Sequence, residues 1–184
     1  SPLADSWRYS AAPPPVTGAA TLPAFASDGC HAYNRPVILR PPTSADAPQW
    51  FDFLVSQQAI VYTGIVPDDF ADRQDGQRDD FLVELEGKFA EPGTARRIVA
   101  EADGAIVGFT LGEVLRDTLY IHIEKADRDY PGAYQMLCRQ FCTAYADGLA
   151  YVNREEDMGD LGLRKAKRDL HPVTQLKKYT VEVW

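Results

Sequence analysis

Residues 118–124 have the sequence TLYIHIE, in which apolar and polar side chains alternate without a break. Strict alternation of this kind is typical of a β-strand with one buried face. It predicts that the apolar side chains Leu119, Ile121 and Ile123 point to one side. The polar face then carries Tyr120 and its neighbours at 122 and 124.

The segments around this strand predict a mixed sheet. Residues 97–101 and 106–113 have strand character, and Asp103-Gly104 between them is a strong hairpin signal. Helical patterns cover 46–54, 81–89, 134–145 and 160–168, and further short strands are expected at 37–40, 149–153 and 176–183. Antiparallel strands that later alternate with helices favour an α/β (α+β mixed sheet) domain with helices on its faces. This order resembles the GNAT (Gcn5-related N-acetyltransferase-like) fold.

Residues 1–35 differ from the rest in composition. They are rich in Pro, Ala, Ser and Gly, include Pro13-Pro14-Pro15, and show no periodicity, which predicts an irregular N-terminal arm. The remaining residues, 36–184, are enough for one domain with a sizeable core. We expect a single GNAT-like unit preceded by this arm.

The cysteines and the apolar runs of the sequence indicate the cellular compartment of the protein. Cys138 and Cys142 lie four apart in a helical pattern without a second Cys or His pair at ligand spacing, which predicts buried thiols and no metal site. No apolar run reaches the roughly 20 residues of a membrane span, and the start lacks signal-peptide features. We therefore expect a cytoplasmic protein.

Charge is unevenly distributed along the chain. The net charge is −8, yet residues 154–184 hold seven Lys and Arg against six Asp and Glu. Most of the surface would repel a polyanion, whereas the stretch 164–178 could contact a phosphate-bearing partner.

The polar face of residues 118–124 is the first candidate site. His122 and Glu124, two positions apart on a strand, are expected to point the same way, and such a pair can take a proton from an attacking amine. A half-exposed sheet face with polar side chains would show the same pattern. The spacing alone leaves both interpretations open.

Two later segments are further candidates. Residues 124–134 include Gly132, which allows a ligand to approach the backbone, and a helix start that favours anions. Residues 153–167 combine charges of both signs in a turn and a helix start. A polar substrate site would look like this, and so would a capped helix with a solvated basic face.

These segments resemble a bacterial family. The stretches that carry the likeness are IHIEKAD (121–127), PGAYQ (131–135), NREEDMG (153–159), GLRKAK (162–167) and KY (178–179). They are similar, over about residues 95–184, to the C-terminal domain of phosphatidylglycerol lysyltransferase. The resemblance implies a GNAT-type fold and transfer of an aminoacyl group from aminoacyl-tRNA to an acceptor hydroxyl or amine. Larger relatives carry two such units in tandem, and this chain has room for one.

One difference from acetyl-CoA-dependent GNAT enzymes concerns the acyl donor. Acetyl-CoA-dependent GNAT enzymes usually show Gln/Arg-x-x-Gly-x-Gly/Ala at this helix start, where the amides hold a pyrophosphate. Aligned on Gly132, this chain has Asp129 first and Tyr134 last, and Pro131 lacks an N–H. A pyrophosphate would meet repulsion and crowding. This favours the 3′ end of an aminoacyl-tRNA, with the basic stretch 164–178 contacting the acceptor stem.

The candidate residues have the following expected roles in acyl transfer. The acceptor is the nucleophile, Glu124 or His122 is the general base, and Asp157 is a competing carboxylate. Backbone amides near Lys125 are expected to hold the acyl carbonyl. The expected donor and substrate contacts are Lys125, Gly132, Tyr134, Gln135, Asn153, Arg154, Glu155, Arg164, Lys165 and Lys167.

Besides aminoacyl transfer, two other functions stay open. None of these three functions requires a resident cofactor. One is acetyl-CoA-dependent N-acetylation of a small molecule. The other is a non-catalytic module that keeps the fold to bind a small molecule or a partner. The sequence does not determine the acceptor, the acyl group or the oligomeric state.

Overall fold

The computed structural model describes residues 3–7, 20–21, 37–61, 74, 76–157, 159–177, 179 and 181. Its strands are β1 (Leu3–Trp7), β2 (Ala20–Thr21), β3 (Val37–Arg40), β4 (Ala95–Ala102), β5 (Ala105–Leu115), β6 (Thr118–Ala126), β7 (Tyr151–Glu156) and β8 (Thr174–Lys177). Its helices are α1 (Ala47–Val61), α3 (Arg78–Ala90), α4 (Ala133–Tyr145) and α5 (Leu161–Arg168), with a short 3-10 helix, η1 (Ser44–Asp46). In the part of the chain that is described, no helix has both the length and the apolarity of a membrane span.

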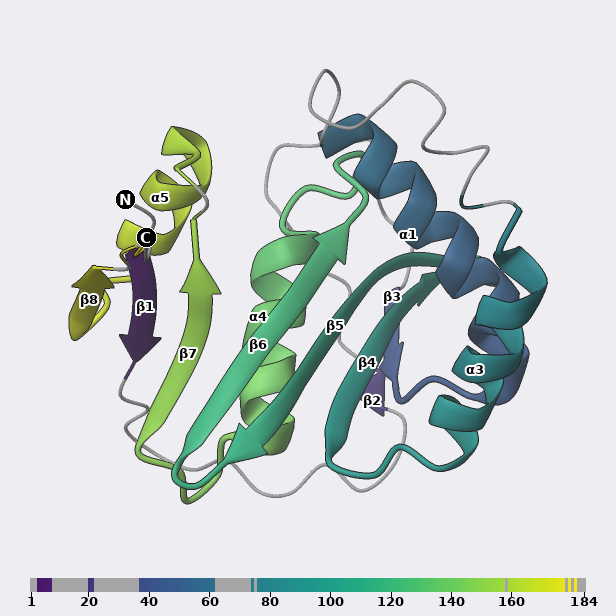
Figure 1. The fold of residues 1–184 in the computed structure, drawn as a ribbon, viewed down its shortest axis with the longest axis horizontal. Coiled ribbons are helices and arrows are strands. Elements are labelled where there is room, and N and C mark those ends of the chain that lie inside the picture. Colours follow the sequence, from purple (N-terminus) through teal and green to yellow (C-terminus); the bar gives the residue numbers. More distant parts are fainter. Residues whose placement is uncertain are drawn as a thin grey trace.

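The strands form one sheet in the order β2-β3-β4-β5-β6-β7-β1-β8. Neighbours from β2 to β6 are antiparallel, whereas β6 and β7 are parallel because α4 carries the chain back between them. Figure 1 shows α1 and α3 in front of β4 and β5, and α4 behind β5 and β6. The predicted mixed sheet with helices on its faces is confirmed.

Two segments of the N-terminal stretch are strands, although the sequence predicted an irregular arm there. β2 pairs with β3, and β1 lies between β7 and β8, antiparallel to both. The sequence of β1, LADSW, does not alternate. Its place depends on backbone pairing with strands far away in the sequence, which composition cannot reveal. The rest of residues 1–35 lies outside the described residues.

Two apolar clusters fill the two faces of the sheet. Under α4, Leu137 and Phe141 are completely buried. On the other face Trp50 packs on Phe109 with ring centroids 3.9 Å apart, and such an aromatic pair adds about 0.5–1.5 kcal/mol beyond its buried area. Both clusters pack against β5. The neighbouring strand β6 is therefore supported by a well-packed part of the sheet.

A β-bulge interrupts β6. Leu111 of β5 lies opposite Ile123, and the next residue, Gly112, lies opposite Ile121. His122 is therefore an extra residue without a partner on β5. A bulge bends its strand and re-aims side chains, and bulges occur often beside active sites.

The bulge reverses the predicted facing of the last residues of β6. Ile121 packs in the cluster under α4, but Ile123 packs in the cluster on the opposite face. Glu124, opposite Thr110, consequently points under α4 and not to the side of His122. The prediction that His122 and Glu124 share a face is wrong, because the apolar-polar alternation runs straight through a bulge that shifts the pleat by one residue.

Gly112 is the residue that allows this bulge. A Cβ at Gly112 would collide with the backbone carbonyl of Tyr120 and lie 2.9 Å from the ring of Phe141. We expect Gly112→Ala to lower the free energy of unfolding by about 3 kcal/mol, as in overpacked cores. In Gly87→Ala, the matched control on α3, the new Cβ meets nothing within 4 Å. That change should raise stability by roughly 0.5–1 kcal/mol. Urea unfolding measures both, and wild-type stability in Gly112→Ala would contradict the bulge.

An ion cluster at η1 predicts how stability depends on pH. Arg40 donates two 2.7 Å hydrogen bonds to the carboxylate of Asp46, and the Thr43 N–H donates a third at 2.6 Å. These bonds lower the pKa of Asp46 from 3.8 to about 2. The stabilisation is complete above pH 3.8 and is lost as the pH falls through 2. Between pH 5 and pH 2 the wild type should therefore lose about 2 kcal/mol more than Asp46→Asn. Urea titrations at both pH values check this, and an equal loss in the variant would refute it.

Candidate active site

β6 and β7 pair only at their first residues and then diverge. Residues 118–120 lie beside 151–153, and within the described part of both strands the pairing goes no further. Figure 1 shows the two strands moving apart toward the top of the sheet. Backbone groups of β6 beyond Tyr120 therefore face a gap instead of a neighbouring strand. Such an edge can hydrogen-bond an extended or carbonyl-bearing ligand.

His122 lies at this gap, on the face that α4 does not cover. One ring nitrogen is 3.1 Å from Glu113 Oε1, and the other contacts the carboxylate of Glu155. The ring of Tyr120 lies nearly parallel to the imidazole, with centroids 6.5 Å apart. The His122 side chain is 33% exposed, so a ligand can reach it. An imidazole oriented by carboxylates and open to ligand is suited to proton transfer.

Glu155 has an unusual backbone conformation. Its φ is +56°, in the left-handed region that non-glycine residues seldom adopt. Asn153 supports this conformation, because its Oδ1 accepts a 2.7 Å hydrogen bond from the Glu155 N–H. Backbone strain of this kind persists only where the surroundings enforce it, and it is concentrated at functional sites. Here Glu155 reaches His122 on one face, while Arg154 reaches Glu124 on the other.

Glu124 is buried beneath α4. Its side chain is 6% exposed, and its Oε1 accepts a 2.6 Å hydrogen bond from Arg154 Nη2. Burial raises the pKa of Glu124, and the charges of Arg154 and Lys167 oppose that rise. The second carboxylate oxygen, Oε2, has no hydrogen-bond partner among the described residues. The ion pair joins β6 to β7 across the gap and anchors Arg154.

Thr110 lies opposite Glu124 on β5 and is completely buried, with no partner for its hydroxyl among the described residues. A valine would keep the shape and remove the unsatisfied group. We expect Thr110→Val to raise the free energy of unfolding by about 1 kcal/mol, measured by urea unfolding. A loss of similar size would instead mean that the hydroxyl bonds to the Glu124 carboxyl.

Three predicted site residues join β7 to α5. The buried carboxylate of Asp157 accepts hydrogen bonds from Arg164 Nε at 2.5 Å and Nη2 at 3.0 Å, and from the Gly159 N–H at 2.9 Å. The ammonium of Lys167, 3% exposed, donates to the three consecutive carbonyls of residues 154–156 at 2.6, 3.1 and 3.0 Å. The sequence assigned Arg164 and Lys167 to substrate contacts and Asp157 to a competing catalytic carboxylate. In the structure all three form contacts within the protein that hold the end of β7.

The remaining predicted residues lie near the start of α4 or on the surface of α5. Gly132 is the N-cap of α4 with φ +85°, a left-handed conformation that favours glycine. Tyr134 is half-buried and Gln135 is exposed. The half-buried Lys125 has a pKa lowered by desolvation, and Lys165 is exposed on α5. The structure therefore groups His122, with its carboxylates, apart from the inward-pointing residues of α5.

Glu113, the second carboxylate at His122, was not predicted from the sequence. The signal was available in the tight turn at 115–117. This turn sets the register of β5 and β6, and Glu113 lies opposite Tyr120 in that register. Residues opposite one another share a face, so the hairpin alone places Glu113 near the next polar residue of that face.

One family model matches more than half of the chain. Residues 71–182 match the family model described as phosphatidylglycerol lysyltransferase, C-terminal. The chain belongs to this family. The resemblance expected from the motifs is confirmed, and the match includes β6, α4, β7 and α5. Every candidate site residue lies within the segment that defines membership of the lysyltransferase C-terminal family.

Solved structures show the fold of this family member. A conserved protein of unknown function from Bacteroides thetaiotaomicron VPI-5482 has 29% identity and a TM-score of 0.59, covering 75% of this chain and 45% of that chain. An aminoglycoside N-acetyltransferase in complex with CoA has 10% identity and a TM-score of 0.59, covering 84% and 99% of the two chains. The expected GNAT-like fold is confirmed.

The relatives that the chain matches are longer than the chain. An uncharacterized protein of Mycoplasmoides gallisepticum (strain R(low / passage 15 / clone 2)) is 31% identical over 78 residues, which are 42% of this chain and 25% of that protein. The chain thus spans less than half of the solved Bacteroides relative and a quarter of the Mycoplasmoides protein.

Proposed function

We propose that this chain transfers an aminoacyl group from aminoacyl-tRNA to an amine or hydroxyl of a small-molecule acceptor. The observation that carries the proposal is His122, held between Glu113 and Glu155 on the open face beside the gap between β6 and β7. Membership of a family described by a lysyltransferase, on a fold shared with acetyltransferases, supports acyl-transfer chemistry.

In the proposed reaction the acceptor nitrogen or oxygen attacks the ester carbonyl of the donor. The acceptor displaces Glu113 from Nε2 of His122, and this nitrogen takes the proton of the attacking atom and returns it to the 3′ oxygen of the tRNA. That oxygen leaves as its bond to the carbonyl carbon breaks and the new amide or ester remains. Glu155, which contacts Nδ1, orients the ring and stabilises the imidazolium. The N–H groups of β6 that face the gap hold the carbonyl oxygen as negative charge develops.

The loop before α4 supports a donor other than CoA. The Asp129 N–H donates to the Asp127 side chain at 2.9 Å. The Tyr130 N–H donates to the Asp127 carbonyl at 3.2 Å, and the Ala133 N–H to the Tyr130 carbonyl at 3.0 Å. Pro131 has no N–H to offer. Four residues of the loop therefore present no N–H group to a pyrophosphate, which needs such donors at a helix start.

A small basic surface on α5 and β8 is proposed to contact the acceptor stem. Lys165, Arg168 and Lys177 are exposed there, and Lys165 also pairs with Asp169 at 2.5 Å. A few phosphate contacts give weak, salt-sensitive binding. We therefore expect the protein to hold only the end of the tRNA.

The test is consumption of labelled aminoacyl-tRNA by the whole chain in the presence of pooled amine and alcohol acceptors. The proposal requires faster loss of the aminoacyl ester than in a control without protein, for at least one of the twenty charged tRNAs. Loss at the uncatalysed rate for all of them would reject the proposal and leave acetyl-CoA-dependent acetylation and the non-catalytic binding module.

The alternative donor is tested by thermal shift. A ligand that binds the native state raises the melting temperature as its concentration rises. A saturable rise with acetyl-CoA, and none with a 3′-aminoacylated oligonucleotide, would replace the proposal with N-acetylation of a small molecule.

A further inference from the structure

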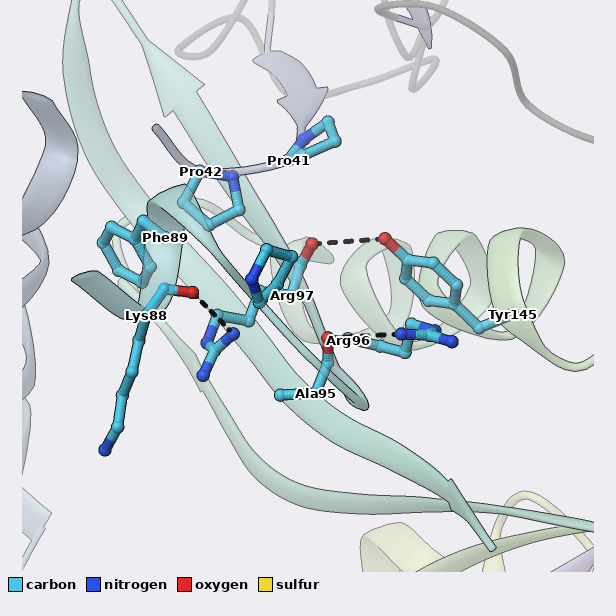
Figure 2. Close-up of a pocket in the computed structure, with 9 residues that line it drawn as sticks. Pro41, Pro42, Lys88, Phe89, Ala95, Arg96, Arg97 and Tyr145 are labelled. Atoms are coloured by element: carbon cyan, nitrogen blue, oxygen red, sulfur yellow. Dashed lines mark hydrogen bonds between the residues drawn. The ribbon is translucent and has the colours of Figure 1, made fainter. Parts of the chain in front are cut away.

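A depression of about 320 Å³ lies at the edge of β4, and one residue that lines it, Ala95, lies opposite Glu113 on β5. β3 ends at Arg40, opposite Val99, and Pro41-Pro42 then leads the chain away. Residues 95–98 of β4 therefore have no strand beside them on that side within the described part of the chain. Figure 2 shows the depression between these prolines, the end of α3 and Tyr145. Tyr145 ends α4, about 20 Å from the helix start next to the β6–β7 gap.

Two consecutive arginines enter this depression from the two faces of β4. The guanidinium of Arg96 lies over the ring of Tyr145, 5.9 Å from its centroid. The guanidinium of Arg97 lies over the ring of Phe89, 5.8 Å from its centroid. Side chains alternate along a strand, so the two groups approach from opposite sides. Each aromatic ring orients its guanidinium without neutralising the charge.

Neither arginine meets a carboxylate in the described part of the protein. Arg96 and Arg97 each donate to protein through Nη1 alone, to backbone carbonyls at 3.2–3.5 Å. Nε and Nη2 of both groups are left for a ligand. Lys88 lines the depression, but its ammonium turns to Glu84 at 2.5 Å and so adds no charge there.

This arrangement is unusual for the composition of the chain. With 27 Asp and Glu against 19 Lys and Arg, carboxylates are in excess. Two adjacent arginines nevertheless have no carboxylate partner among the described residues, and Arg97 is partly desolvated, which lowers its pKa. Desolvation of an unpaired cation is costly, and a bound anion would offset that cost.

We propose that this depression binds a small molecule with a pyrophosphate or two neighbouring phosphate groups. Guanidinium groups bind phosphate oxygens through parallel N–H donors, with geometric selectivity that an ammonium lacks. Two guanidinium groups on opposite sides of a strand suit an anion with two charged centres. The volume is at the lower end of the roughly 300–1,000 Å³ of small-molecule sites. The site is independent of the proposed aminoacyl transfer.

Sodium pyrophosphate is the probe, and calorimetric titration of the whole chain at constant ionic strength is the measurement. We expect saturable binding that weakens about tenfold or more in Arg96→Gln, because a charge-assisted pair is lost. Arg97→Gln should have the same effect. Arg97 also packs on Phe89. If Arg97→Gln does not fold because this packing is lost, Arg96→Gln still provides the test. Arg139→Gln, on the exposed side of α4, is the matched control that should bind like the wild type.

The control separates a built site from general charge attraction. Equal weakening in Arg139→Gln would mean that only net charge matters and would overturn the proposal. Wild-type affinity in Arg96→Gln, or heat that does not saturate, would overturn it as well. So would binding to a short nucleic-acid duplex without binding to pyrophosphate, because the partner would then be a polymer.

Discussion

Lys167→Met is expected to lower the free energy of unfolding by roughly 1 to 3 kcal/mol, the cost of leaving buried hydrogen-bond acceptors unsatisfied. The ammonium of Lys167 donates to three consecutive carbonyls at the end of β7. Methionine fills a similar volume and offers no donor, so all three carbonyls stay buried without this partner. Chemical unfolding in urea measures the loss.

Lys165→Met is the matched control for this prediction. Lys165 is on the same helix, but its side chain is 76% exposed and pairs only with Asp169, four residues later. An exposed pair of this kind contributes about 0.5 kcal/mol or less. If the two variants lost the same stability, Lys167 would be an ordinary surface lysine and the account of β7 would be wrong.

His122→Gln is expected to reduce aminoacyl transfer by about 10²- to 10⁴-fold, the usual contribution of a general base. Glutamine retains hydrogen bonding to Glu113 and Glu155 but cannot take a proton from the acceptor. Because the side chain is partly exposed, stability should change by no more than about 1 kcal/mol. Initial rates of aminoacyl-tRNA consumption, with a melting curve of each protein, give both values.

His171→Gln is the control for this loss of activity. His171 is exposed in the turn between α5 and β8, away from the gap. Its replacement should leave the rate unchanged. Equal rates for His122→Gln and the wild type would remove His122 from the chemistry and return attention to the buried Glu124.

The order of elements from residue 37 onward could be predicted because it depends on local periodicity. The hairpin at Asp103-Gly104 and the α5 start at Asp160, whose side chain accepts from the Leu163 N–H, both appeared where the sequence indicated them. The bulge in β6 could not be predicted from TLYIHIE, because alternation continues through it. Its sign lies in the partner strand, where only a glycine at 112 fits.

The candidate site was predictable in part for the same reason. His122, Asn153 and Glu155 were each selected from the sequence as candidate site residues, and the structure brings them together beside one gap, because residues at strand ends on one face converge. Lys167 and Arg164 were assigned to ligand contacts, since basic residues on a short helix usually face solvent. The tertiary contact of α5 with the end of β7 turns them inward, and no local pattern encodes that contact.

The central claim is that the site beside His122 transfers an aminoacyl group from tRNA. The most direct measurement offers isotopically labelled aminoacyl-tRNA and differently labelled acetyl-CoA together, with pooled amine and alcohol acceptors, and identifies the products by mass spectrometry. The account predicts an amide or ester that carries the aminoacyl label, formed by the wild type and lost in His122→Gln. Products that carry the acetyl label, or aminoacyl products formed equally by His122→Gln, would contradict it.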